Sequence, residues 1–580
     1  MDNVKIKLND IEISVPKGSS IVDAAKLADV NIPTLCHLNL HDLKAVNRVA
    51  SCRVCMVEIE GRRNLAPACA TFVSEGMNIK THTPRVVNAR RTIVELLLSD
   101  HPTDCLICEK NQKCDLQKLA ADLGVRKLKY QGAMSTYERD CSSKSIYRNL
   151  DKCILCRRCE TMCNEVQTCG ILSAVDRGFE TVVAPAFGLP MSETMCTFCG
   201  QCVAVCPTAA LTEINNIPEV WNALNDPKKV VVVQTAPAVR VALGEEFGME
   251  PGTIVTGKMV TALRNLGFNK VFDTDFAADL TIIEEASEFA HRLQHGGRLP
   301  ILTSCCPAWV KFFEHQFPDL LDIPSSCKSP HEMFGAIAKT YYAKKMNIDP
   351  KDMVVVSIMP CIAKKYEAAR QELGNDGAIN VDYVLSTREL GLMLKEAGIN
   401  FATLEDSDFD HPLGESTGAG VIFGTTGGVI EAALRTAYEW LTGQTLEQVD
   451  FVQLRGLDGI REATVKINDM DVKIGVAHGL GNARKLLEAI REGKADYHAI
   501  EIMACPGGCI GGGGQPYHHG DVEIIKKRAA AIYREDKGKA KRKSHENQDV
   551  IKLYKEFLGE FYGDKAHELL HTHYTKREKI

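Results

Sequence analysis

The sequence has few aromatic residues, little charge imbalance and no long apolar run. Aromatic side chains make up 6% of the 580 residues, and 69 Lys plus Arg against 75 Asp plus Glu leave a net charge of −6. A chain so close to neutral offers no electrostatic basis for binding nucleic acid. No stretch of about 18 apolar residues occurs, and the N-terminus has no apolar signal core. We therefore expect a cytoplasmic protein without membrane insertion.

Cysteine, by contrast, is abundant, with 23 residues in an uneven distribution. The cytosol keeps thiols reduced, and an odd count argues against a disulfide framework, so metal binding is the leading interpretation. Seventeen cysteines lie before residue 207, mostly in tight groups, and six lie in four places farther on. Only Cys141, Cys169 and Cys327 stand alone, as small core residues do.

The first group has one close pair and two distant members: Cys36, Cys52, Cys55 and Cys69. A C-x2-C pair with two distant cysteines is the general arrangement of a [2Fe–2S] cluster, although plant-type ferredoxins use C-x4-C-x2-C. Residues 4–15 predict a hairpin around Asn9-Asp10, and residues 20–28 predict a helix capped near Ser20. This order predicts a [2Fe–2S] ferredoxin-like β-grasp domain over residues 1–81. A zinc site with four cysteines is the alternative.

The second group lies in the run HPTDCLICEKNQKC and comprises His101, Cys105, Cys108 and Cys114. Three thiolates and one imidazole so close together could hold zinc or a [4Fe–4S] cluster, and the spacing alone does not choose. A histidine in place of a thiolate would raise the potential of a cluster by removing one negative charge. We interpret residues 82–141 as a [4Fe–4S] domain with one histidine and three cysteine ligands.

Two further groups repeat the pattern C-x2-C-x2-C-x3-C, and Pro207 follows the second; Asn164 stands where the first would have its proline. In bacterial two-cluster ferredoxins, the fourth cysteine of each run binds the other cluster. The pattern therefore predicts two [4Fe–4S] clusters over residues 142–215, which would complete an electron relay of four clusters. The expected ligand sets are Cys153, Cys156, Cys159 and Cys206 for one, and Cys163, Cys196, Cys199 and Cys202 for the other.

Residues 216–580 alternate short apolar segments with segments of helical period, which predicts an α/β catalytic domain with mostly parallel sheets. Cysteines follow three of these predicted strands. Because open α/β folds place ligands at the carboxyl ends of strands, these thiolates are expected to close on one further cluster. The predicted strands cover residues 229–236, 300–304, 353–359, 420–424, 472–479 and 498–504, with helices at 284–293, 387–398 and 482–493.

The three cysteine loops resemble the signatures of the [FeFe]-hydrogenases. TSCCPxW, MPCxxKxxE and ExMACxxGCxxGGGQP are all complete, and the resemblance covers nearly the whole chain. It implies reversible conversion of two protons and two electrons to dihydrogen at an H-cluster. That cofactor is a [4Fe–4S] cube bridged by Cys509 to a di-iron unit with carbon monoxide, cyanide and a bridging dithiolate. The cube's ligands would be Cys306, Cys361, Cys505 and Cys509.

The same resemblance assigns roles to other side chains. Cys305 is similar to the family's terminal proton relay, and a thiol with a pKa of about 8.5 suits that task. Lys364 is expected to donate to a cyanide nitrogen, with Glu367 orienting it. The path from Cys305 to the surface would use Glu285, Glu288, Ser325 and Arg292, and the di-iron unit would be lined by Pro237, Met359 and Met503.

The resemblance also indicates partners. Electrons would pass to ferredoxin or, alternatively, to NAD(P)-linked flavoprotein or iron–sulfur subunits of a heteromeric, electron-bifurcating complex, and maturation proteins would supply the di-iron unit. A non-catalytic hydrogen sensor is a third interpretation. The glycines at 418–424 and 479–481 fall short of a dinucleotide fingerprint and are interpreted as turns. The HELLH run at 567–571 matches a zinc protease motif but has no downstream domain to form a cleft. The basic stretch 526–543 is interpreted as a solvated helix face.

Overall fold

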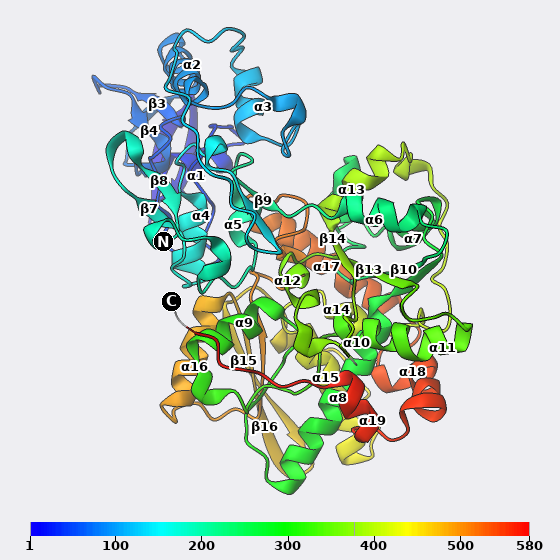
Figure 1. Cartoon of the computed structure of the whole chain (residues 1–580). Helices are drawn as coiled ribbons and strands as arrows, with labels where there is room; N and C mark the ends of the chain where they lie inside the picture. Colours follow the sequence, from blue (N-terminus) through cyan, green and yellow to red (C-terminus); the bar gives the residue numbers. More distant parts are fainter. Residues whose placement is uncertain (1, 376, 579–580) are drawn as a thin grey trace.

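The computed structural model describes residues 2–375 and 377–578 as two parts lying side by side (Figure 1). The first part, from β1 to β9, contains small sheets and short helices, and the second contains two four-stranded sheets and most of the helices. Among the described helices, none is long and apolar enough to cross a membrane. All 23 cysteines are free thiols.

A mixed five-stranded sheet with strand order β2-β1-β5-β3-β4 opens the chain. The predicted hairpin is confirmed, because Asn9 and Asp10 turn with φ of 50° and 72°, the positive values that a two-residue hairpin turn requires. The predicted helix is also confirmed, and the Ser20 side chain caps it by accepting from the Asp23 amide. The elements are β1 (Asn3–Leu8), β2 (Ile11–Pro16), α1 (Ile21–Leu27), β3 (Met56–Ile59), β4 (Ala66–Pro67) and β5 (Asn78–Lys80).

The middle of the first part consists mainly of short helices and strands. Two helices follow the first sheet, and two small antiparallel ribbons, β6 with β9 and β7 with β8, frame the next cysteine runs. The elements are α2 (Pro84–Ser99), α3 (Asp115–Asp122), β6 (Ile146–Arg148), α4 (Arg158–Thr161), β7 (Ser173–Val175), β8 (Val182–Ala184), α5 (Gln201–Val205) and β9 (Leu211–Glu213).

Two sheets form the centre of the second part, with strand orders β11-β10-β13-β14 and β12-β17-β16-β15. Every pairing is parallel except β15 with β16, as the mostly parallel prediction requires. β13 and β17 are fully buried apolar runs, which suit sheets covered on both faces, whereas the antiparallel pair β15 and β16 has exposed residues. The strand bounds are β10 (Val230–Thr235), β11 (Lys270–Asp273), β12 (Ile301–Leu302), β13 (Met353–Met359), β14 (Tyr383–Ser386), β15 (Ile460–Ile467), β16 (Met470–His478) and β17 (Ala499–Met503).

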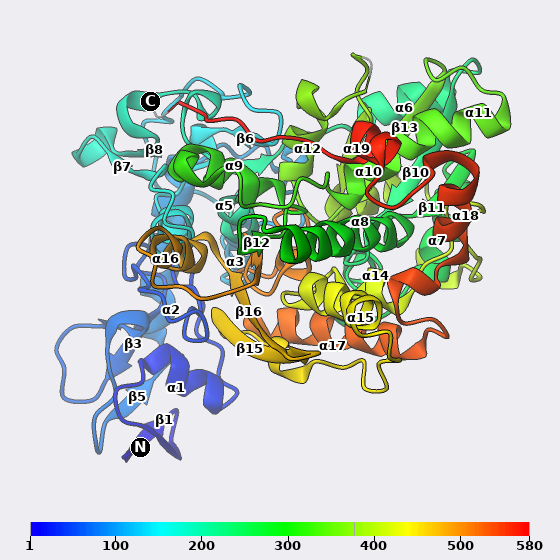
Figure 2. The same ribbon diagram turned by 90° about the horizontal axis from the view of Figure 1, so that it is seen from below.

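The long helix α8 (Thr274–His295) runs through the middle of this part (Figure 2). It packs against α10 (Pro330–Ile337), α14 (Gly418–Ile422) and α15 (Gly428–Thr442), so most of its length is buried. The other helices are α6 (Ile217–Asn225), α7 (Thr256–Asn265), α9 (Pro307–Gln316), α11 (Ala343–Met346), α12 (Ala363–Ala368), α13 (Thr387–Glu396), α16 (Leu480–Arg491), α17 (Val522–Gly538), α18 (Gln548–Leu553) and α19 (Asp564–Leu570).

Several sequence predictions in this part are wrong. Residues 420–424 were expected to form a strand but lie in and just after α14, because a short buried apolar run has no period that separates strand from helix. Gly418 and Gly420 are therefore helical residues and not turns. In the basic stretch, Lys526 is exposed but Arg528 is buried beside Glu245, so only part of it is a solvated face.

Candidate functional site

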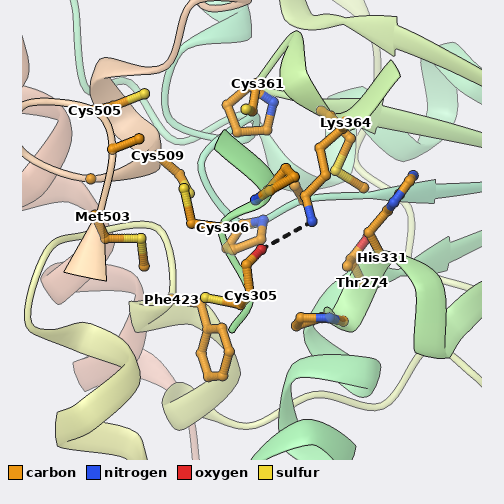
Figure 3. A pocket seen from close by; sticks show the side chains of 18 residues that line it. Thr274, Cys305, Cys306, His331, Cys361, Lys364, Phe423, Met503, Cys505 and Cys509 are labelled. Carbon is orange, nitrogen blue, oxygen red and sulfur yellow. Dashed lines mark hydrogen bonds between the residues drawn. The ribbon is translucent and has the colours of Figure 1, made fainter. Parts of the chain in front are cut away.

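Four thiols from three loops converge on one cavity of about 70 Å³. The loops follow β12, β13 and β17. β12 and β17 are parallel neighbours in one sheet, which brings Cys306 and Cys505 together, and β13 of the other sheet contributes Cys361. Figure 3 shows the side chains reaching the cavity from these separate loops. Its walls are otherwise mainly apolar and include all three residues expected there, Pro237, Met359 and Met503. The four converging thiols are Cys306, Cys361, Cys505 and Cys509, and Cys305 lines the same cavity.

The chemistry of this cavity fits a metal cluster. Burial raises the pKa of Cys361 to about 12, with the neighbouring Cys306 thiolate adding to it. Burial likewise raises the pKa of Cys306 and of Cys505. Several thiolates so close together are stable only beside positive charge, which bound iron supplies. In addition, the buried His331 Nε2 has no hydrogen-bond partner within the described residues, and this side chain lines the cavity.

A buried charged triad forms one side of the cavity. Lys364 Nζ lies 2.7 Å from Glu367 Oε2 and donates to the Cys305 carbonyl at 3.1 Å, the dashed contact in Figure 3. His331 Nδ1 lies 3.0 Å from the same carboxylate oxygen. Burial alone would lower the pKa of Lys364, but the Glu367 carboxylate raises it above its usual value. A lysine held cationic at an apolar cavity is suited to an anionic acceptor.

Two residues that line the cavity were missed from the sequence. Thr274 follows β11 and so lies at the carboxyl end of a strand that was not predicted. Phe423 follows α14, in the segment wrongly predicted as a strand. Thr274 follows the apolar run KVFD, so its place after a strand could have been predicted from the sequence. No comparable sequence pattern indicates that Phe423 lines the cavity.

The residues expected on the proton path lie together on and beside α8. Ser325 Oγ donates to Glu288 Oε2 at 3.0 Å, and Arg292 pairs with Glu288 Oε1 at 2.5 Å. Burial, and next the Glu288 carboxylate, raise the pKa of Glu285 to about 8. Burial and then the Glu285 carboxylate raise the pKa of Cys305. The structure therefore joins Ser325, Glu288 and Arg292 by direct contacts, with Glu285 on the same helix and Cys305 at the cavity.

Two smaller cavities contain the repeated cysteine runs. In each, three consecutive cysteines of one run meet the last cysteine of the other run. The α4 and α5 helices each contain the third cysteine of one run and pack against each other. The structure thus groups Cys153, Cys156, Cys159 and Cys206 in one cavity, and Cys163, Cys196, Cys199 and Cys202 in the other, with Cys169 also lining the second.

The remaining two groups lie in the outer region of the first part. Cys55 Sγ and Cys69 Sγ are 3.3 Å apart, and the Cys36 side chain contacts both Cys52 and Cys69. Of the second group, His101 is buried, and its Nδ1 lacks a hydrogen-bond partner among the described residues. The cysteines of that group are all partly exposed.

Contacts connect these sites in a fork. The loop of the first group donates from Ser51 Oγ to the Cys156 carbonyl at 3.2 Å. The second group connects to the same cavity, because the Asp115 amide donates to the Pro207 carbonyl at 2.9 Å. The two cavities of the repeated runs adjoin, and the second reaches the catalytic loops through Gln201, which donates to the Gly511 carbonyl at 2.9 Å. The two outer cysteine groups therefore both adjoin the cavity of the Cys153 set.

The three single cysteines do not share one environment. Cys327 is buried, as expected of a core thiol. Cys141, however, is exposed, so its interpretation as a core residue is wrong. A single cysteine has no partner or period from which its burial could be predicted.

Such a fold and site define an iron–sulfur oxidoreductase with a buried cavity lined by cysteines. The chain belongs to the iron-only hydrogenase family, a class of oxidoreductases acting on hydrogen. The family model "iron only hydrogenase large subunit, C-terminal domain" matches residues 229–513, and "iron hydrogenase small subunit" matches 522–577. A 2Fe-2S cluster binding domain matches 1–84, an NADH-ubiquinone oxidoreductase-G iron–sulfur region 90–129, and a 4Fe-4S binding domain 190–212.

Individual relatives support the same family. The chain is 62% identical to the NADP-reducing hydrogenase subunit HndD of Solidesulfovibrio fructosivorans over 100% of both chains. It is 40% identical to iron hydrogenase 1 of Clostridium pasteurianum over 98% of this chain and 100% of that protein. A solved structure of an apo variant of the [FeFe]-hydrogenase HydA1 from Chlamydomonas reinhardtii shares 44% identity, with a TM-score of 0.57 over 63% of this chain and 99% of that one.

Proposed function

We propose that this chain is the hydrogen-activating subunit of a heteromeric NADP-linked hydrogenase and interconverts protons, electrons and dihydrogen in its second part. The observation that carries the hydrogen chemistry is the convergence of four thiols, Cys305 and Lys364 on one apolar cavity. The link to NADP is supported by 62% identity over the whole chain to a relative named as a subunit of an NADP-reducing hydrogenase.

The cavity would hold the H-cluster. Cys306, Cys361, Cys505 and Cys509 would bind the [4Fe–4S] cube, and Cys509 would connect it to the di-iron unit. When bound, that unit supplies a redox-active metal centre at which protons and electrons are exchanged with dihydrogen. The apolar wall excludes water, and Lys364, kept cationic by Glu367, offers a hydrogen-bond donor to an anionic ligand.

The proton route would run from Cys305 through Glu285, Ser325 and Glu288 to Arg292. Glu285 carries its proton at neutral pH because its pKa lies at about 8, so it can both give and receive one. Ser325 bonds Glu288 directly, and Arg292 keeps the Glu288 carboxylate oriented near the surface. Glu285, Glu288 and Arg292 lie on α8, Ser325 lies on the loop beside it, and Cys305 lines the cavity.

The electron route would use four clusters in a fork. A β-grasp [2Fe–2S] domain and the His101 [4Fe–4S] site would be two alternative points of entry, and both adjoin the cluster on the Cys153 set. From there the route would pass to the Cys163 set and then to the H-cluster. The crossed grouping of the two cysteine runs in two cavities supports these ligand sets.

A partner subunit would dock at the His101 site. Leu106 and Ile107 lie between two of its cysteines and are 90% and 83% exposed, an unusual apolar surface beside a cluster site. Nucleotide chemistry would belong to the partners, because the glycines at 418–424 and 479–481 fall short of a dinucleotide fingerprint, and Gly418 and Gly420 lie within helix α14.

Two experiments test these proposals separately. Infrared spectra of the matured, active protein should contain bands of metal-bound carbon monoxide and cyanide; active, iron-loaded protein without them would refute the H-cluster. Native purification should recover flavin-containing subunits and hydrogen-dependent NADP reduction. Purification of the chain alone, active with dye or ferredoxin but never with NADP, would refute the heteromeric complex and leave the hydrogenase intact.

A further inference from the structure

A second hydrogen-bonded chain branches from Glu288 into the C-terminal segment. Ser326 Oγ lies 3.2 Å from Glu288 Oε2 and 2.8 Å from His571 Nδ1. His571 Nε2 lies in turn 2.8 Å from Glu284 Oε2. The segment is held in place by backbone pairing, since Cys327 and His571 form a β-bridge and the Thr572 amide donates to the Ser326 carbonyl at 2.7 Å.

The partners of Glu284 determine where one proton lies. This carboxylate is fully buried, and its Oε1 accepts from the Tyr554 hydroxyl and from the Tyr562 amide. Its Oε2 is then available to accept a hydrogen bond from the imidazole that faces it. His571 therefore carries a proton on Nε2 and donates it to Glu284.

Whether His571 Nδ1 carries a proton depends on the direction in which the Ser326 hydroxyl points. If the hydroxyl points at His571, Nδ1 accepts and the imidazole is neutral. If the hydroxyl points at Glu288, Nδ1 must donate to Ser326 Oγ, and the imidazole is doubly protonated and cationic. The two arrangements differ by one proton, and rotation of one hydroxyl connects them.

We propose that Glu284 and His571 form a proton-holding pair that loads Glu288 through the Ser326 hydroxyl. In discharge, the Nδ1–H bond breaks and its proton moves to Ser326 Oγ, while the proton already on that oxygen moves to Glu288 Oε2. One proton leaves the imidazolium, one arrives at the carboxylate, and Nε2–H remains on Glu284. The proposal rests on the proposed function, because Glu288 belongs to the proposed proton path.

The groups around His571 favour this assignment. On α8, the Glu284 and Glu288 carboxyl groups both lie beside its ring, and Arg292 pairs with Glu288. Tyr554 and Cys327, from neighbouring segments, are neutral, because burial first and nearby carboxylates next raise the pKa of each. The other residues that face His571 are Ser326, Tyr562 and, on α19, His567, whose ring stacks on it at 4.2 Å.

A metal ion is a less suitable occupant of this place. Glu288, Cys327 and His571 lie close enough to share an ion, and all three are buried. Both nitrogens of His571 are already hydrogen-bonded, however, and neither is free to bind a metal. Proton exchange uses the same contacts without breaking them.

The test compares Ser326→Ala, Ser326→Thr and His571→Gln with His567→Gln, on the helix α19 just before His571, as the matched control. The first readout is independent of activity: pH-difference infrared spectra of full-length, cluster-loaded protein carrying isotope-labelled histidine. His571→Gln should remove one titrating histidine signal, and His567→Gln should leave that signal in place. Retention of every titrating signal in His571→Gln would overturn the proposal.

The second readout is the pH profile of hydrogen oxidation with a dye. Ser326→Ala and His571→Gln should lower kcat by about tenfold and move the profile, while Ser326→Thr restores the hydroxyl and the wild-type profile. Equal losses in Ser326→Ala and Ser326→Thr, or an unchanged profile in His571→Gln, would refute the relay. Wild-type protein inactive with hydrogen would instead refute the proposed function, since the histidine signal does not depend on turnover.

Discussion

Replacement of Glu285 by glutamine separates the electrostatic cost of this side chain from its role in proton transfer. Its pKa rises from 4.5 to about 8, chiefly through burial, which corresponds to about 5 kcal/mol against ionisation in the fold. Between these two values the folded state binds more protons than the unfolded state, so stability falls as pH rises. The glutamine side chain of Glu285→Gln does not ionise, so this variant does not lose stability in this way as pH rises. Its free energy of unfolding should therefore exceed that of the wild type by an amount that grows by about 4 kcal/mol from pH 5 to pH 8.

Anaerobic denaturant unfolding followed by tryptophan fluorescence measures this difference in the relevant part, because Trp221, Trp309 and Trp440 all lie after β9. The exposed Glu488→Gln on α16 is the control for the change of a carboxyl to an amide. At pH 7 Glu285→Gln should also lose about 10²–10⁴-fold in kcat, because an amide cannot relay a proton. A stability difference that stays constant from pH 5 to pH 8 would refute the raised pKa, and full activity would refute the path.

Three further substitutions test the site. Cys305→Ala should lower kcat by about 10²–10⁴-fold with unchanged iron content, as measured by turnover and iron analysis; loss of iron would make Cys305 a ligand. Lys364→Met leaves the buried Glu367 carboxylate without its lysine partner and should destabilise the protein by about 3–5 kcal/mol in denaturant unfolding. The double variant Lys364→Met with Glu367→Gln should recover part of this lost stability. Equal losses of stability in the single and double variants would refute a stabilising Lys364–Glu367 ion pair. Cys206→Ala should alter the paramagnetic resonance signal of the Cys153 cluster and leave that of the Cys163 cluster, whereas the opposite pattern would refute the crossed ligand sets.

The ligand groups were predictable because they are local. Cys153, Cys156 and Cys159 stand within one short loop, and a cluster of fixed size selects that spacing whatever the rest of the chain does. The hairpin at Asn9 and the cap at Ser20 were predictable for the same reason, since turn and capping chemistry act over two to four residues.

The segment 420–424 shows a limit of predicting secondary structure from local sequence patterns. Its five residues are apolar and bounded by glycine, which suits a buried strand as well as a buried helix. Contacts of α14 with α8, α15 and α17 decide for the helix, and α8 and α17 are both far from it in sequence. The same error concealed Phe423, which lines the cavity.

By itself, the sequence predicted the grouping of the cysteines, the α/β class of the second part and the hydrogenase family, because each depends on short motifs and periodicity. Tertiary structure alone decided how these pieces connect. The contacts of Ser51 and Asp115 toward the Cys153 set, and the meeting of His571 with Ser326 and Glu284, join residues separated by about 90 to 290 positions. Such contacts follow from how whole elements pack, and packing is a property of the complete chain that no motif spans.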